Sequence, residues 1–257
     1  MWIGVVSIFP NMFGSLTGEG VVARAVASGA LTLDLENPRD HTVDRHATVD
    51  DRPYGGGPGM VMKAEPLLRA VAALKQRAGG EVRTIYVSPQ GERLVQSKVE
   101  MLARHPRLLF IAGRYEGIDE RVVETVVDEE ISLGDFVVTG GELPVMVVVD
   151  ALARHLPGTL GNAASAEAES YRSGLLDWPH FTRPERIPLH AVPPVLLGGD
   201  HAAIERWRLG CALVRTYERR PDLLSARRLS GTERALLAEY FTTAPQDNCR
   251  VSNSMEP

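Results

Sequence analysis

The chain has 257 residues, 44% of them hydrophobic, and a net charge of −5 at neutral pH. This length allows a substantial buried core in one large domain or two. Neither Cys211 nor Cys249 has metal-ligand spacing and the seven histidines are scattered, so we expect no structural zinc and no other dedicated metal site. The N-terminal MWIGVVSIFP is too short to cross a bilayer and lacks a basic leader and a cleavage site, which predicts a cytoplasmic protein that does not bind membranes.

Strand patterns and helix patterns alternate along the first 155 residues. Apolar runs at 2–9, 31–36, 82–88 and 108–112 predict buried strands, and helical periodicity covers 20–28, 66–77, 94–104 and 142–155. Residues 37–62 form a long loop that is dense in charge and glycine. This alternation is typical of an α/β domain with a largely parallel sheet.

The pattern changes after residue 160. Residues 161–175 are small, polar and weakly patterned, as in a flexible linker. A proline-rich stretch follows, and then helical patterns at 200–219 and 231–241 indicate a small all-helical domain. We therefore predict an α/β domain over 1–160, a flexible interdomain linker over 161–175, a helical domain over 176–243 and a disordered tail over 244–257.

Charge is divided between the two parts of the chain. Residues 1–171 contain 16 Lys+Arg against 23 Asp+Glu, a net charge of −7. Residues 172–234 contain 11 arginines, no lysine and 7 acidic residues, a net charge of +4. A basic region of this kind indicates an anionic partner such as nucleic acid. A solvated helical surface explains the same charge about equally well.

Residues 109–150 contain two apolar runs that each break into a glycine-rich loop, GRYEG and GDFVVTGG, and then resume as a helical pattern. Sheets of this class bind ligands beyond their strand ends. Neither loop matches a Walker A or G-x-G-x-x-G motif, and the segment holds ten acidic residues against two arginines. The acidic residues would repel a polyphosphate. A nucleoside with a cationic arm, such as S-adenosylmethionine, is therefore the better candidate ligand.

Two further loops belong with these. The segment IYVSPQGERL at 85–94 delivers Ser88, Pro89, Gln90 and Gly91 to the same sheet edge if the strands are parallel, so that three loops converge on one site. DDRPYGGGPGM at 50–60 combines four glycines with charged residues and a tyrosine, which allows close backbone approach to a ligand. A tight structural turn remains the alternative for this loop.

Six segments together closely resemble the bacterial tRNA (guanine-N1-)-methyltransferases, and the likeness extends from residue 1 to about 241. They are DRHATVDDRPYGGGPGM, YVSPQG, GRYEGIDERV, SLGDFVVTGGELPVM, GLLDWPHFTRPE and VPPVLLGGDHAAIERWR. The resemblance implies the SPOUT fold, in which the chain around residues 85–140 forms a deep trefoil knot. It also implies a homodimer with shared active sites, which methylates N1 of guanine 37, next to the anticodon, when another guanine precedes it.

The resemblance further implies that loops of the knot bind S-adenosylmethionine. Carried over to this sequence, the cofactor-binding residues are Tyr86, Ser88, Pro89, Gly113, Tyr115, Glu116, Leu133, Gly134, Asp135, Phe136, Val137, Val138, Gly140 and Gly141.

By the same resemblance Glu169 is the general base that removes the proton of guanine N1, and Arg154 stabilises the negative charge that develops on O6. The family usually has Asp at the position of Glu169, and Glu167 is a nearby competitor for the role. On residues alone, Arg154 reads as charge compensation at a helix C-terminus. The family also implies dependence on Mg²⁺, for which the sequence shows no dedicated ligand set.

The target base must be unpaired to expose N1, as bases of the anticodon stem-loop can be. Asp50 and Arg52 are expected near that base, and the arginines of the second domain are expected to contact tRNA phosphates. We interpret Trp207, Tyr217, Tyr240 and Phe241 as helical packing residues. The phosphate-contact candidates are Arg183, Arg186, Arg206, Arg208, Arg215, Arg219 and Arg220, of which Arg183, Arg208 and Arg215 are the first choices.

Two other functions stay open at this point. An RNA-binding or regulatory protein could keep the fold and the cofactor pocket but have little turnover, because its base position has changed. A nucleotide-hydrolysing α/β enzyme is disfavoured, because the sequence lacks a P-loop lysine.

Overall fold

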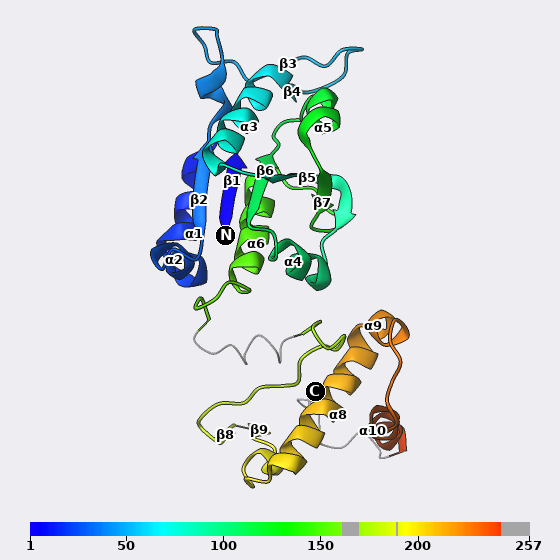
Figure 1. Cartoon of the computed structure of the whole chain (residues 1–257). Helices are drawn as coiled ribbons and strands as arrows, with labels where there is room; N and C mark the ends of the chain where they lie inside the picture. The colour runs from blue at the N-terminus through cyan, green and yellow to red at the C-terminus, as the bar shows by residue number, and fades with distance from the viewer. Residues whose placement is uncertain (161–169, 189, 243–257) are drawn as a thin grey trace. The chain divides into compact units, whose positions relative to one another are not determined.

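The computed structural model describes residues 1–160, 170–188 and 190–242. The chain divides into two compact units, residues 1–163 and 164–257 (Figure 1). The first unit is an α/β domain and the second contains mostly helices. Each unit has an apolar core of its own.

A five-stranded sheet forms the centre of the first unit. Its strand order is β2-β1-β6-β5-β7, and every neighbouring pair is parallel. The predicted α/β class with a largely parallel sheet is thereby confirmed. The strands are β1 (Trp2–Val6), β2 (Thr32–Glu36), β5 (Arg83–Arg93), β6 (Arg107–Ala112) and β7 (Glu129–Ser132).

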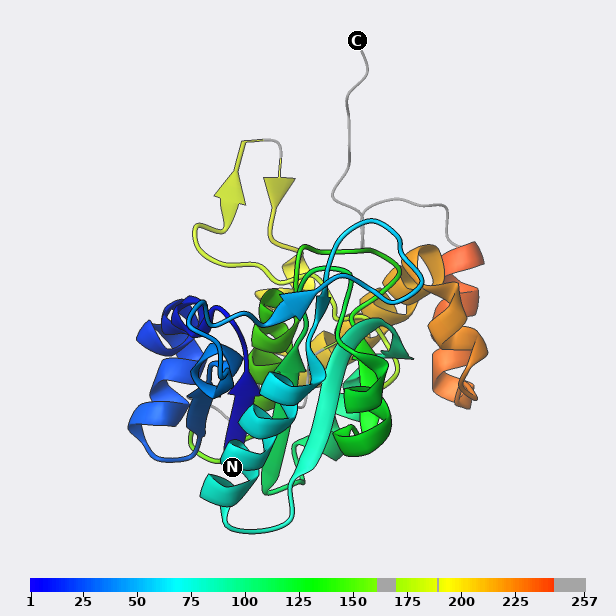
Figure 2. The same cartoon turned by 90° about the horizontal axis from the view of Figure 1, so that it is seen from above.

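Helices cover both faces of this sheet (Figure 2). In β6, Leu108 and Phe110 belong to the apolar cluster on one face, whereas Leu109 and Ile111 belong to the cluster on the other. Because successive strand residues point to opposite faces, a strand covered on both sides reads as one continuous apolar run. The first face is packed by α2 (Gly20–Ala27), α4 (Gln96–Leu102) and α6 (Glu142–Ala153), and the second by α3 (Ala64–Ala78) and α5 (Glu120–Val126).

Several short elements of this unit were not predicted. Strand β1 is followed by η1 (Pro10–Phe13) and α1 (Gly14–Gly18). The predicted loop at 37–62 contains η2 (Pro38–His41) and a two-residue antiparallel pair, β3 (Asp50–Asp51) with β4 (Val61–Met62). These elements are too short to produce a recognisable period in the sequence.

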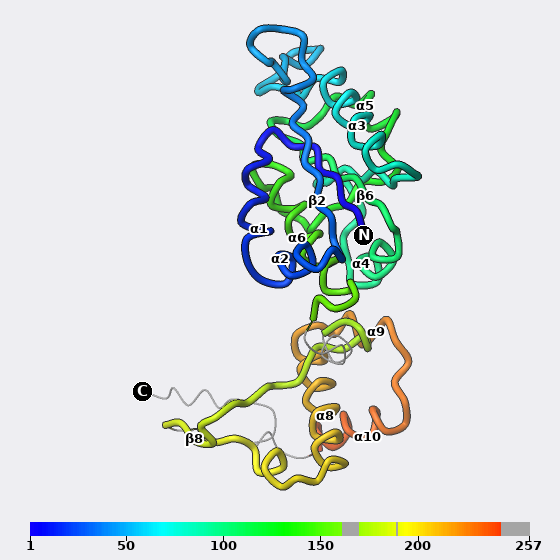
Figure 3. The backbone as a smooth tube through the Cα atoms, turned by 60° about the vertical axis from the view of Figure 1, so that its left-hand side comes forward, coloured from blue at the N-terminus to red at the C-terminus, as the bar shows by residue number. Residues whose placement is uncertain are grey.

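The second unit is built on α8 (His201–Arg219) and α10 (Gly231–Thr242), whose backbones are traced in Figure 3. Asp200 caps α8 by accepting hydrogen bonds from two backbone amides of its first turn. Leu213 of α8 and Leu236 and Leu237 of α10 form the core together with Leu175. Shorter pieces are η3 (Pro194–Leu196) and α9 (Pro221–Ser225).

The prediction of an all-helical second domain was wrong. Strand β8 (Arg186–Ile187) pairs antiparallel with β9 (His190–Ala191). A strand of two residues is too short to show an alternating pattern, and the surrounding prolines argue against a strand. Residue 175, which the sequence placed in the linker, is buried in the core of this unit. The predicted disordered tail and residues 161–169 of the predicted linker lie outside the described residues.

Within the described ranges, no helix is long and apolar enough to cross a bilayer.

Glu129 of β7 should make stability depend on pH. Burial raises its pKa, but hydrogen bonds from Arg83 and Lys98, with their charges, lower it more, so the net pKa is below the usual value. A depressed carboxyl pKa stabilises the fold above the unfolded-state value of about 4.3, and this contribution is lost as pH falls through the folded pKa. Glu129→Gln should therefore lower the free energy of unfolding by about 1–3 kcal/mol at pH 7.

Chemical denaturation at pH 7 and at acid pH tests this expectation. The difference from wild type should disappear at acid pH, and a constant difference would contradict the role of the ionised carboxylate. Glu92→Gln is the matched control, because Glu92 binds the same lysine through a carboxylate that is 69% exposed. Its effect should stay below about 0.5 kcal/mol.

Candidate functional site

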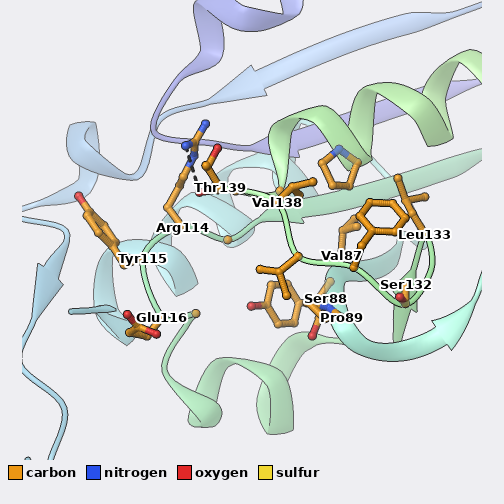
Figure 4. A pocket seen from close by; sticks show the side chains of 18 of the residues that line it. Val87, Ser88, Pro89, Arg114, Tyr115, Glu116, Ser132, Leu133, Val138 and Thr139 are labelled. Carbon is orange, nitrogen blue, oxygen red and sulfur yellow. Dashed lines mark hydrogen bonds between the residues drawn. The ribbon is translucent and has the colours of Figure 1, made fainter. Parts of the chain in front are cut away.

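Three loops at the carboxyl ends of neighbouring strands surround a cavity of about 200 Å³ in the first unit (Figure 4). The first loop is a bulge within β5, and the other two follow β6 and β7, the neighbours of β5 in the sheet. Thirteen of the fourteen residues carried over as cofactor-binding line this cavity, and Asp135 does not. The lining also includes residues that the sequence reasoning missed, namely Val87, Arg114, Gly117, Ser132, Thr139 and Pro144.

The first loop is a break in the ladder between β5 and β7. Val87 and Glu92 both lie opposite Ile131, so residues 88–91 leave the ladder. Of these, Ser88 and Pro89 line the cavity, whereas Gln90 and Gly91 do not. The amide of Gln90 donates a hydrogen bond to the Ser88 hydroxyl at 3.1 Å, which fixes the turn. A side chain at Gly91 would collide with the backbone of Glu130, so only glycine fits there.

The second loop follows β6. A Cβ at Gly113 would stand 2.9 Å from the hydroxyl of Tyr86, so the loop lies directly on that ring. Burial, together with nearby Glu130, raises the pKa of Tyr86, so its hydroxyl stays protonated at neutral pH. Tyr115 has a φ of 61°, a left-handed conformation that costs non-glycine residues energy and is concentrated at functional sites.

The third loop, residues 133–141, folds back onto the end of β6. The amide of Gly141 donates to the carbonyl of Gly113 at 2.8 Å, and a Cβ on Gly141 would stand 2.7 Å from Cα of Ala112. At the beginning of the loop, the Ser132 hydroxyl and Gly134 are hydrogen-bonded. The middle of the loop is exposed at Phe136, Val137 and Val138.

A buried carboxylate connects these loops to the sheet. Glu142, in the first turn of α6, is fully buried. Its Oε1 accepts from the Ser7 hydroxyl at 2.8 Å, and its Oε2 accepts from Nε of Arg114 at 2.7 Å. Arg114 also donates to the carbonyl of Thr139 at 3.2 Å, as the dashed line in Figure 4 shows. Arg114 thus connects the second loop to α6 through the ion pair, and to the third loop through the Thr139 carbonyl.

Arg114 was not predicted, although it is one of only two arginines in the acidic segment 109–150. Its guanidinium lies 4.7 Å from the ring centre of Phe9 and occupies the space that a side chain at Gly140 would need. The available signal was its place as one of two arginines among ten acidic residues. Its partner Glu142 gave none, because an acidic residue in the first turn of a helix is common.

The glycine-rich loop at 50–60 is attached to the second loop. The amide of Glu116 donates to the carbonyl of Met60 at 3.0 Å, and the amide of Met62 donates to the carbonyl of Gly117 at 2.9 Å. Asp50 is half-buried in β3, and Arg52 and Tyr54 are exposed. The predicted base-contacting loop is therefore held next to the loop that contains Tyr115 and Glu116.

Of the two predicted catalytic residues, the structure describes Arg154, which lies away from the cavity. Arg154 is half-buried at the C-terminal cap of α6, whereas Pro144 near the other end of that helix lines the cavity. Ten residues of helix separate them by roughly 15 Å, which is more than an arginine side chain spans. Glu169 and its competitor Glu167 lie outside the described residues.

The predicted phosphate-binding arginines have different surroundings. Arg183 is exposed, whereas Arg208 pairs with Glu205 at 2.7 Å and lies over the ring of Trp178. Burial, followed by the charge of Arg219, lowers the pKa of Arg215, which faces the carbonyl of Asp177. In the described ranges, no three His, Cys, Asp or Glu side chains are grouped so that they could hold a metal ion.

The chain is similar to known proteins over most of its length. Residues 1–226 match the family model described as tRNA (Guanine-1)-methyltransferase TrmD. A relative from Pseudomonas paraeruginosa, named tRNA (guanine-N(1)-)-methyltransferase, is 60% identical over 94% of this chain and 96% of its own length. Relatives with the same name from Aeromonas hydrophila and Photobacterium profundum are each 55% identical, over 93% and 94% of this chain and 96% and 97% of their own lengths.

Replacing Glu142 by Gln tests the buried network. The amide cannot accept hydrogen bonds from both Ser7 and Arg114 through two oxygens, so the buried Ser7 hydroxyl or the half-buried Arg114 guanidinium loses its partner. We expect the free energy of unfolding to fall by about 3–5 kcal/mol, as for other broken buried pairs. The control, Glu65→Gln, breaks an exposed pair with Arg69 and should change it by less than about 0.5 kcal/mol. Equal effects of the two substitutions in chemical denaturation would contradict the assigned role of Glu142.

Proposed function

The chain belongs to the TrmD family of tRNA (guanine-1)-methyltransferases, and we propose that it transfers a methyl group from S-adenosylmethionine to N1 of guanine 37 in tRNAs with G36-G37. The observation that carries the proposal is the cavity at the carboxyl ends of β5, β6 and β7. Its position is that of cofactor sites in open parallel sheets. A tRNA substrate also favours a cytoplasmic location.

The chemistry of the lining suits S-adenosylmethionine. Leu133, Val137 and Val138 provide apolar contacts for a nucleoside, and glycine backbones allow close approach. Glu116 contributes negative charge, which favours the ammonium and sulfonium groups of the ligand. The charge of Arg114 is already balanced by Glu142, so the cavity offers a polyphosphate no unpaired cation among the residues described as its lining.

The arrangement of the loops supports the SPOUT knot as part of this proposal. β6 lies between β1 and β5, and the chain then crosses to form β7 on the far side of β5. The third loop returns from β7 to the end of β6, where Gly141 is hydrogen-bonded to Gly113. A chain that crosses and returns around residues 85–140 has the course that a trefoil knot there requires.

The cofactor, when bound, supplies the methyl group. Guanine N1 becomes nucleophilic enough to accept that group only after it has lost its proton. We assign the removal of that proton to the carboxylate of Glu169, whose side chain is one methylene longer than the aspartate usual in the family. The guanidinium of Arg154 then stabilises the negative charge on O6. Mg²⁺ is expected from the family, but because the described residues contain no metal-binding group, we assign no step to it.

The position of Arg154 supports a homodimer with shared sites. Within one subunit, Arg154 lies roughly 15 Å along α6 from the cavity, so it can serve a cavity only in a second copy. On the same helix, Leu143 and Val147 are 52% and 53% exposed and lie one turn apart. With Asp150 and Arg154 they follow one face of α6, as i, i+4 and i+7 positions do. An apolar helix face that ends in the catalytic arginine suits a second copy of the chain.

The arginine-rich second unit provides the tRNA-binding surface in this proposal. Arg183, Arg208 and Arg215 are assigned to the anticodon stem-loop, and Asp50 and Arg52 to the region of the target base. The hydrogen bonds from the second cavity loop to Met60 and Met62 support the latter assignment, because they hold this segment beside the cofactor site.

A methylation assay tests the proposed function directly. Purified protein with labelled S-adenosylmethionine should methylate a tRNA transcript with G36-G37 and leave the matched A37 transcript unlabelled. Equal labelling of both transcripts would contradict the specificity for guanine 37. If the wild type is inert and Glu169→Asp is active, the protein is an RNA-binding or regulatory relative with little turnover.

Mixing variant subunits tests the shared site. Arg154→Ala and Glu169→Gln should each lower kcat by roughly 100-fold or more. If one site takes these two residues from different subunits, a heterodimer of the two variants has one intact site and about half of the wild-type activity. Recovery of activity on mixing therefore supports the shared site, and its absence in isolated heterodimers would contradict a site that takes the two residues from different subunits. Glu167→Gln should retain activity, and the reverse result would assign the base to Glu167.

A further inference from the structure

We propose that a second cavity, beneath Trp178 and Arg208 in the helical unit, binds one unpaired nucleobase of the tRNA. This cavity has a volume of about 370 Å³. Its lining combines the apolar side chains of Leu175, Leu209 and Ala212 with charged and aromatic groups. The proposal rests on the proposed function, because it takes tRNA as the partner, but it concerns binding and not methyl transfer.

Hydrogen bonds hold the wall of this cavity in place. The segment from Ser170 to Trp178 is fixed to α8, because the amide of Leu176 donates to the Thr216 hydroxyl at 2.9 Å. The amide of Asp177 donates to the Ser170 hydroxyl, also at 2.9 Å. Leu175 between them is buried in the core. The backbone before Trp178 is therefore held in place at several points.

Side chains at the opening are oriented by their own contacts. One oxygen of the Asp177 carboxylate accepts from the amide of Trp178 at 2.8 Å, and the other lies 2.8 Å from the His180 ring. The guanidinium of Arg208 stands 5.2 Å from the centre of the Trp178 ring. An indole and a guanidinium plane in this arrangement are the groups on which unpaired RNA bases stack.

The charges around the cavity select a base over a phosphate. Asp177 and Glu205 supply carboxylate acceptors, and Arg206 and Arg208 supply donors. A phosphate would be repelled by the two carboxylates, since it carries acceptors alone. The edge of a nucleobase carries both donors and acceptors. The apolar faces of the base suit the apolar side chains of Leu175 and Leu209 in the lining.

The existing ion pairs do not prevent such binding. Arg206 pairs with Glu239 and Arg208 with Glu205, and all four side chains are at least 38% exposed. Exposed pairs of this kind contribute little stability, so hydrogen bonds to a base can replace them. The surrounding region has a net charge of +4, which favours the approach of RNA.

Equilibrium binding of full-length protein to tRNA with a single abasic nucleotide tests the proposal. Such tRNAs can be assembled by ligation, with the abasic position moved through the unpaired nucleotides of the anticodon loop. Trp178→Ala should weaken binding of intact tRNA by roughly 10- to 100-fold, the usual effect of losing one stacked base. For one abasic position the wild type and Trp178→Ala should bind equally, because the base that Trp178 contacts is already missing.

Two further variants separate stacking from folding. Trp178→Phe keeps an aromatic face and should restore most of the affinity. Phe241→Ala removes an exposed aromatic ring of the same unit that does not line the cavity, and it should bind tRNA like the wild type.

If Trp178→Ala weakens binding equally for every abasic tRNA, or not at all, the base site is overturned. An equal loss for every tRNA would point instead to a structural role or to another occupant of the cavity. The measurement needs no turnover, so it is independent of the methylation assay. A wild type that binds tRNA but does not methylate G37 contradicts the proposed function and leaves the base site to be decided by the abasic series.

Discussion

The geometry around the cavity of the first unit depends on the buried carboxylate of Glu142. A fully buried charge costs several kcal/mol unless it is paired and hydrogen-bonded, and Glu142 has both kinds of partner. The N-terminus of α6 adds a favourable dipole. Through Ser7 the carboxylate reaches the segment after β1, and through Arg114 it reaches the second loop and the carbonyl of Thr139. Segments that are up to 135 residues apart are therefore positioned by one group.

The three loops could be predicted from the sequence because their causes are local. Buried parallel strands read as apolar runs, and each run ends where glycine allows the backbone to turn or to approach another chain segment. Gly91 and Gly141 show why, since a Cβ at either position would collide with neighbouring backbone. Once the strands are parallel, their carboxyl ends share one edge, so the loops must meet. The local sequence pattern was therefore enough to predict the loops that contain most of the residues that line the cavity.

Features that depend on distant partners could not be predicted in this way. Nothing in the sequence around Glu142 indicates that its partners are Ser7 and Arg114. The strand pair β8 and β9 was missed because two residues carry no period. Periodicity did place Arg154 at the end of an apolar helix. Its distance from the cavity, however, became apparent only when the structure showed that Pro144, near the start of the same helix, lines that cavity.

The charge balance of the cavity connects these observations to the chemistry. Arg114 is the one cation among the residues described as lining the cavity, and Glu142 already neutralises it. Removal of the guanine N1 proton before methyl transfer places negative charge on O6. Arg114 could stabilise that charge only by leaving a buried carboxylate unpaired, which would cost several kcal/mol. In the proposed function, a second cation therefore comes from outside the cavity. Within one subunit α6 holds Arg154 at its far end, so we assign that role to Arg154 of a second copy. The ion pair that positions the cavity loops is thus also an argument for the shared site that we propose.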